Sequence, residues 1–155
     1  MEYRLHEWMA KRNLSAIDTD QLVSRFKRWL RSKSDSDIQE ILMTAFIPDD
    51  YEEDGEREKI FSKLVETAIC EIFRRIGFRA KLVKPKNETE DIQITIAGKT
   101  ILVDAKTFRL GRSQIAPNVK DFIKLHTFRT WILNYNLRHR KAQAIGGLVV
   151  YPSYP

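Results

Sequence analysis

The order of the sequence patterns predicts a mixed α/β fold, in which helices cover the faces of a sheet of mixed strand direction. Apolar residues recur at helical spacing over 60–76, and Gly77 is placed to end that helix. The pattern then changes to the period of two typical of strands, over 78–106. A long helical segment that opens at Pro117 and an apolar run at 145–151 complete the order. A strand hairpin followed by a helical crossover and a further strand produces such a sheet.

The first part of the chain is predicted to be helical. Apolar residues recur at helical spacing over 18–33, with lysines and arginines on the other face. A second, short helix follows, with Asp35 or Asp37 as its cap. We therefore expect a helical N-terminal region over 1–48 and an α/β core over 49–155.

The core is predicted to contain two helices and four strands. The acidic segment 49–58 leads into the first helix, whose positive dipole end the acids stabilise. The second helix runs from Pro117 to about Arg140, and Ala97-Gly98 is the turn of a hairpin. The four predicted strands cover 78–83, 91–96, 100–106 and 145–151.

Length and composition exclude several classes of protein. The 155 residues suit one domain, and no apolar run approaches the ~20 residues of a membrane span. The N-terminus lacks the apolar segment of a signal peptide, so we expect a cytoplasmic protein without a membrane partner. The single cysteine, Cys70, excludes an internal disulfide and a multi-cysteine zinc site.

Charge is distributed unevenly along the chain. The net charge is +6, and the segment 105–141 has nine lysines or arginines against one acid. Such a basic half suits a polyanionic partner, with nucleic acid as the first candidate. A solvated surface that happens to be basic is the alternative.

Three residues of the predicted hairpin form a candidate catalytic cluster. Asp104 and Lys106 lie two residues apart and therefore share one face of their strand. If Ala97-Gly98 is a two-residue turn, paired positions sum to 195 and Asp91 falls opposite Asp104. Two carboxylates so close repel each other unless a cation or a proton lies between them. Oxygen ligands without nearby histidine or cysteine favour a hard divalent ion, Mg²⁺ first.

Each of these residues also has a simpler interpretation. Asp91 alone is typical of a turn before a strand, and Asp104 with Lys106 of an exposed ion pair. The catalytic interpretation depends on the predicted register, which brings the three together.

The pattern resembles the PD-(D/E)XK nuclease superfamily and, more closely, the HindIII-type type II restriction endonucleases. The likeness covers roughly residues 58–152. It is carried by KIFSK at 59–63, by Asp91, by VDAKTFRLGR at 103–112 and by KDF at 120–122. The resemblance implies a restriction-endonuclease-like core with the order αβββαβ.

The resemblance also implies roles for individual residues. Asp91 would be the first metal ligand and Asp104 the second, with the carbonyl of Ala105 completing the protein's share. Lys106 would act on the attacking water. One departure is Glu90, which stands where the superfamily has the proline of its name, a backbone device rather than a chemical group.

A helix carboxylate often supplements such sites in the superfamily. Glu66 lies just outside the apolar stripe of 60–76 and matches the acidic position after the Phe-Ser-Lys motif. Glu71 is the rival, and a solvated glutamate is the alternative to both.

Two basic segments are candidate DNA contacts. Positions 120, 124, 131 and 138 share one face of the predicted helix, where lysines, an arginine and a tryptophan suit a phosphate backbone. A solvated basic face with its tryptophan in the core is equally compatible. The loop after the catalytic strand adds further polar groups. The predicted DNA-binding residues are Arg109, Arg112, Ser113, Gln114, Lys120 and Lys124.

The expected function is Mg²⁺-dependent, site-specific hydrolysis of phosphodiester bonds in double-stranded DNA by a type II restriction endonuclease. Relatives of this type extend further downstream, so we expect a core truncated at its C-terminal end and a homodimer in the full-length enzyme. One alternative is a DNA-binding or assembly fragment that does not cut. Another is a structure-specific repair or resolvase-type nuclease of the same superfamily.

Overall fold

The computed structural model describes residues 4–12, 18–53, 55–84, 89–109 and 125–151, and these contain five helices and six strands. The helices are α1 (Arg4–Ala10), α2 (Thr19–Arg31), α3 (Asp35–Met43), α4 (Glu56–Arg75) and α6 (Leu125–Arg138). The strands are β1 (Phe46–Ile47), β2 (Arg79–Leu82), β3 (Ile92–Ile96), β4 (Lys99–Ala105), β5 (Phe108–Arg109) and β6 (Ala144–Val150). In these segments no helix is both long and apolar enough to cross a membrane.

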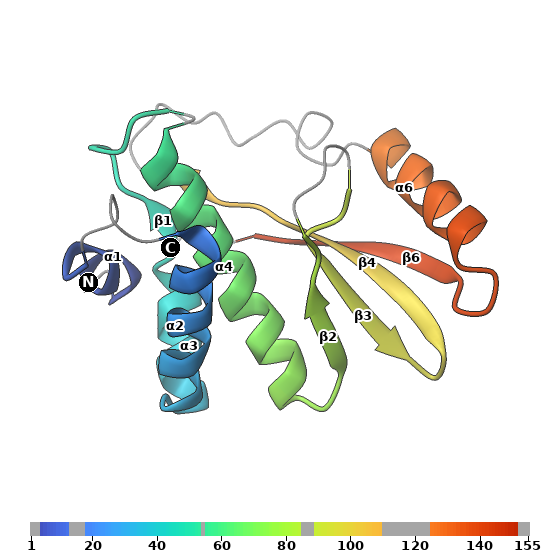
Figure 1. Cartoon of the computed structure of the whole chain (residues 1–155), viewed down its shortest axis with the longest axis horizontal. Helices are drawn as coiled ribbons and strands as arrows, with labels where there is room; N and C mark the ends of the chain where they lie inside the picture. The colour runs from blue at the N-terminus through green and yellow to red at the C-terminus, as the bar shows by residue number, and fades with distance from the viewer. Residues whose placement is uncertain (1–3, 13–17, 54, 85–88, 110–124, 152–155) are drawn as a thin grey trace.

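The main sheet has the mixed topology that the sequence predicts. Its strand order is β2-β3-β4-β6, with antiparallel pairing up to β4 and parallel pairing between β4 and β6. The helix α4 packs on one face of this sheet and α6 on the other (Figure 1). The order helix, three strands, helix, strand is thereby confirmed, and the fold is consistent with a restriction-endonuclease-like core.

The central helix α4 follows from its apolar stripe. Its inward side chains, among them Phe61, Leu64 and Val65, are almost fully buried. Gly55 precedes the helix without a side-chain cap, and acids in the first turn oppose the helix dipole instead. At the other end Gly77 adopts a φ of +97°, which ends the helix as predicted because glycine enters this region without a steric penalty.

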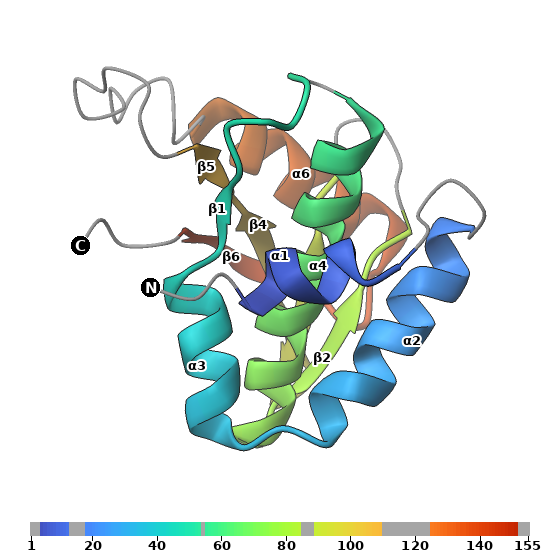
Figure 2. The same ribbon diagram turned by 90° about the vertical axis from the view of Figure 1, so that its left-hand side faces the viewer.

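The N-terminal helices α2 and α3 lie on the side of α4 opposite the sheet (Figure 1 and Figure 2). Their apolar residues join those of α4 and the sheet in one hydrophobic core. The cap of α3 differs from the prediction of Asp35 or Asp37. Ser34 is the cap, and Asp37 completes a capping box by accepting from the Ser34 backbone N–H.

The hairpin of β3 and β4 has the predicted register. Ile92 pairs with Val103 and Ile96 with Lys99, so paired positions sum to 195. Ala97 and Gly98 both have positive φ, 46° and 76°. A two-residue type I′ hairpin turn requires positive φ at both central positions.

A second, two-stranded sheet is a feature that the sequence did not predict. β1 pairs in parallel with β5, which joins the chain before α4 to the chain after β4 (Figure 2). Arg109 therefore lies in a strand and not in the expected loop. Two-residue strands are too short to show a period, which is why the sequence pattern did not reveal them.

The helix α6 packs closely over β6. A Cβ at Gly147 would overlap the ring of Phe128, whereas one at Gly146 would meet nothing within 4 Å. The predicted start of this helix, Pro117, lies outside the described residues, and its end at Arg138 is close to the predicted one.

Candidate active site

Asp91 lies where the β3–β4 ladder ends. There its side chain, and not a backbone carbonyl, accepts the next hydrogen bond from β4. The last regular pair is Ile92 with Val103. The N–H of Asp91 donates to the Val103 carbonyl at 2.9 Å, and the N–H of Ala105 donates to the Asp91 carboxylate at 2.8 Å. Asp91 is thus displaced from the position opposite Asp104, but its carboxylate is held against the same strand.

Asp104 and Lys106 form an ion pair on one face of β4. Lys106 Nζ is 2.8 Å from the Asp104 carboxylate. The aspartate is buried, with 7% of its surface exposed, whereas the lysine side chain remains partly exposed. Parallel pairing fixes the end of the strand, because the backbone N–H of Lys106 donates to the Val150 carbonyl at 2.8 Å. The carboxylate is therefore rigidly placed while the amine can reach solvent.

Glu66 reaches the same region from α4. Its carboxylate pairs with Lys63 Nζ at 2.5 Å, one helical turn earlier. Burial raises the pKa of Glu66, the Lys63 ammonium opposes this shift, and the negative charge of Asp104 adds to it. Glu66 and Asp104 therefore act on each other electrostatically across the helix–sheet boundary.

The effect of the neighbouring carboxylates is largest on the pKa of Asp91. The pKa of Asp91 is raised to about 7, with burial as the largest cause and the charges of Glu66 and Asp104 as further ones. The hydrogen bond from Ala105 and the charge of Lys63 act in the opposite direction. Three carboxylates thus share one partly buried site, where a positive ion would relieve their repulsion.

The structure separates Glu66 from its rival. Glu71 pairs with Arg75 at 3.5 Å and with Arg74 at 3.9 Å, both on α4. Both glutamates pair with a basic residue of α4, but only Glu66 also interacts electrostatically with Asp91 and Asp104.

Further residues that support the site were not predicted. Lys63 neutralises Glu66, and its i,i+3 spacing from Glu66 is the signal that sequence reasoning could have used. Ser62 on α4 shares a 2.9 Å hydrogen bond with Thr107, the residue after Lys106. No local spacing relates Ser62 to Thr107, which are 45 residues apart. This bond ties the helix to the chain that leaves the catalytic strand.

The oxygen atoms at this site suit a hard divalent ion, with water in its remaining coordination positions. Among the described residues, no group of three or more His, Cys, Asp and Glu side chains stands ready to hold a metal ion. The carboxylates of Asp91 and Asp104 are instead engaged by the Ala105 N–H and the Lys106 ammonium. Mg²⁺ commonly takes only one or two carboxylates and keeps several waters. Asp91, Asp104 and a backbone carbonyl fit that requirement.

Arg109 has a different role from the predicted DNA contact. Its guanidinium is buried, with 9% of the residue exposed, and it donates to the carbonyl oxygen of Tyr51 at 2.6 Å. It also forms an ion pair with Glu58. This arginine holds the segment before α4 to β5, so it is not presented to a ligand. The other predicted DNA contacts, Arg112, Ser113, Gln114, Lys120 and Lys124, lie outside the described residues.

Comparison with known proteins identifies the family of the chain. A search of curated proteins gives no match to the chain. The family model for the HindIII restriction endonuclease matches residues 7–154, nearly the whole chain. The match includes α4, all four strands of the main sheet and the acidic cluster. The chain therefore belongs to the HindIII restriction endonuclease family.

Proposed function

We propose that this protein is a type II restriction endonuclease that hydrolyses phosphodiester bonds at specific sites in double-stranded DNA and depends on Mg²⁺. The observation that carries the proposal is the cluster of Asp91, Asp104 and Glu66, with Lys106 beside it, where β3, β4 and α4 meet. Family membership supports the nuclease class.

In the proposed mechanism Asp91 and Asp104 would hold the ion through their carboxylates, and the carbonyl of Ala105 would be the third protein ligand. A bound Mg²⁺ ion lowers the pKa of water and offsets negative charge on the phosphate. Lys106, whose ammonium lies beside Asp104 and is partly exposed, would position the attacking water. Glu66 would supply a further carboxylate to the same site. No covalent intermediate is needed, because water is the nucleophile.

The remaining parts of the proposal concern the DNA and the assembly. Arg112, Ser113, Gln114, Lys120 and Lys124 would contact phosphates or groove edges, as cationic and polar side chains do in DNA complexes. The enzyme would act as a homodimer, because a two-fold dimer matches a palindromic site. Such an enzyme would work in the cytoplasm.

Cleavage of supercoiled plasmid DNA tests the proposal. The protein is incubated with Mg²⁺ or with a chelator, beside Asp104→Asn and the control Asp50→Asn, which changes an exposed aspartate. We expect discrete Mg²⁺-dependent fragments from the protein and the control, and none from Asp104→Asn. Unchanged turnover in Asp104→Asn would refute the proposed site.

Two other results would favour the alternatives. Salt-sensitive DNA binding without cleavage would indicate a fragment that keeps the fold but does not cut. Preference for branched DNA over a linear site would indicate a structure-specific nuclease.

A further inference from the structure

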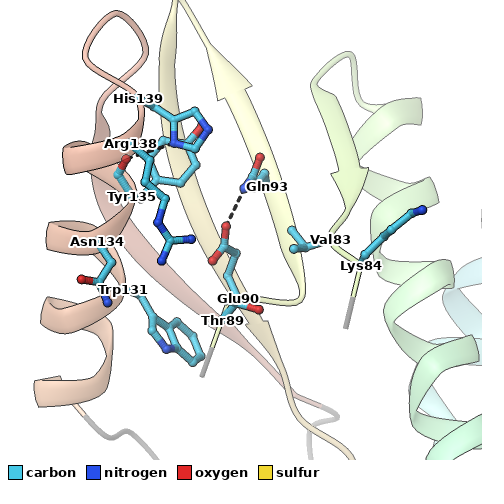
Figure 3. A pocket seen from close by; sticks show the side chains of 10 residues that line it. All are labelled: Val83, Lys84, Thr89, Glu90, Gln93, Trp131, Asn134, Tyr135, Arg138 and His139. Carbon is cyan, nitrogen blue, oxygen red and sulfur yellow. Dashed lines mark hydrogen bonds between the residues drawn. The ribbon is translucent and has the colours of Figure 1, made fainter. Parts of the chain in front are cut away.

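A pocket of about 270 Å³ lies between α6 and the ends of β2 and β3, on the α6 face of the sheet (Figure 3). None of the catalytic residues proposed above lines it. Glu90 does, and this residue directly precedes Asp91 in the chain. The pocket is therefore separate from the acidic cluster but next to it.

The chemistry of the pocket is dominated by the buried carboxylate of Glu90, for which the described residues supply one hydrogen bond. Glu90 is 8% exposed, and its partner is Gln93, also 8% exposed, whose Nε2 donates to Glu90 at 2.5 Å. In the described part of the chain Glu90 forms no ion pair. A carboxylate can accept several hydrogen bonds, so Glu90 can accept more than the one from Gln93. The pocket thus calls for a ligand that donates N–H groups.

Aromatic side chains of α6 and of His139, the residue after it, form the opposite wall. The rings of Tyr135 and His139 are stacked, with centroids 4.1 Å apart and planes at 17°. The Tyr135 hydroxyl is fixed by a 3.2 Å hydrogen bond with Thr100 Oγ1 on β4. Trp131 lines the same pocket, and its buried indole N–H has no hydrogen-bond partner among the described residues. Such a wall suits a flat heterocycle, which stacks on aromatic rings.

The pocket also contains a cationic side chain, that of Arg138. Arg138 extends from α6 toward the Glu90 carboxylate (Figure 3), and the two groups do not form an ion pair. An acceptor group and a donor group therefore face a common space. A ligand that carries donors beside an acceptor on one planar edge would satisfy both.

We propose that this pocket binds a single guanine base. The Watson–Crick edge of guanine carries two adjacent donors, N1–H and N2–H, which a carboxylate can accept together, and the neighbouring O6 is an acceptor for Arg138. Thymine and uracil place an acceptor on each side of their single donor, so a carboxylate is repelled there. Adenine and cytosine offer Glu90 one donor group each. The expected order of affinity is guanine first and thymine or uracil last.

The base can come from two sources. One is a free guanine nucleotide. The other is a guanine turned out of duplex DNA beside the cleaved bond, since enzymes read such bases by stacking and by hydrogen bonds to this edge. The second source rests on the function proposed above, whereas the first does not.

Equilibrium dialysis of the metal-free protein against GMP, AMP, CMP and UMP tests the proposal. We expect GMP to bind most tightly, and Glu90→Gln to weaken GMP binding by about tenfold or more, because hydrogen bonds to a charged acceptor are lost. Arg138→Met should also weaken GMP binding, and it changes an exposed side chain, so it stays informative if Glu90→Gln does not fold. Glu71→Gln is the matched control, because its carboxylate pairs with arginines of α4.

A second measurement separates the two sources. Duplex DNA with one unpaired guanine is compared with the same duplex carrying an unpaired thymine, in a chelator so that no cleavage occurs. A preference for guanine that Glu90→Gln abolishes identifies DNA as the source, and GMP binding without that preference identifies the free nucleotide. Equal binding of all four nucleotides, or GMP affinity unchanged in both pocket variants, would overturn the proposal. Neither measurement requires cleavage, so a negative plasmid assay would count only against the nuclease function.

Discussion

Replacing Asp91 with asparagine should stabilise the metal-free protein at neutral pH, although it removes a candidate metal ligand. The Asp91 carboxylate is partly buried and interacts unfavourably with Glu66 and Asp104. Asparagine keeps a side-chain oxygen that can accept the hydrogen bond from the Ala105 N–H, but it carries no charge. The substitution therefore removes the repulsion while it retains the local contact.

The size and sign of the effect follow from the pKa of Asp91. The native pKa of about 7 lies above the ordinary value of 3.8, so the folded protein binds this proton more tightly than the unfolded chain does. The stability that this provides is fully present below pH 3.8 and is lost as the pH rises through about 7. The whole difference corresponds to at most about 4 kcal/mol, of which about 2–3 kcal/mol falls between about pH 5 and pH 8.

Urea unfolding in the presence of a chelator measures this effect. The free energy of unfolding is determined at about pH 5 and pH 8 for the protein, for Asp91→Asn and for the exposed control Asp50→Asn. We expect the advantage of Asp91→Asn over the unmodified protein to grow by about 2–3 kcal/mol between the two pH values. Added Mg²⁺ should raise the stability of the unmodified protein and not that of Asp91→Asn, because only the former retains both aspartates.

A difference in unfolding free energy that is the same at both pH values would refute the reasoning. It would mean that the Asp91 carboxylate ionises in the folded protein as easily as in the unfolded chain. Asp50→Asn should show no such pH-dependent gain, since its side chain is exposed.

Three further substitutions test other parts of the structure. Gly147→Ala should lower the free energy of unfolding by about 1–3 kcal/mol, because the new methyl group overlaps a ring of α6, while Gly146→Ala should have little effect in urea unfolding. Arg109→Met should cost about 3–5 kcal/mol in the same assay, because it leaves Glu58 without its charge partner, and adding Glu58→Gln should recover part of that loss. Lys106→Ala should abolish plasmid cleavage with little change in Mg²⁺ affinity by calorimetry, and a loss of metal binding would contradict the assigned role.

Local patterns predicted those elements whose physical cause is itself local. The apolar stripe over 60–76 predicted α4, and the alternation around Ala97-Gly98 predicted the hairpin with its register. A strand period and a two-residue turn together leave little freedom in pairing. Asp104 and Lys106 could be placed on one face for the same reason, and their ion pair agrees with that placement.

Contacts between distant segments could not be predicted in this way. The two-residue pairing of β1 with β5, and the burial of Arg109 that accompanies it, depend on residues about 60 positions apart. The position of Asp91 outside the ladder also escaped prediction. It depends on a bond from its side chain to the Ala105 backbone, which strand periodicity does not describe.

The sequence by itself determined the order of the elements, the hairpin register and the identity of the acids, because helical and strand periods and turn residues act over a few positions. Only the tertiary structure decided which acids share an environment. Glu66 comes from a helix, Asp104 from a strand and Asp91 from the residue just before a strand. Packing brings their charges close enough, and far enough from water, to raise the pKa of Asp91. The repulsion between these carboxylates depends on their distance in space and on burial, and not on their spacing along the chain.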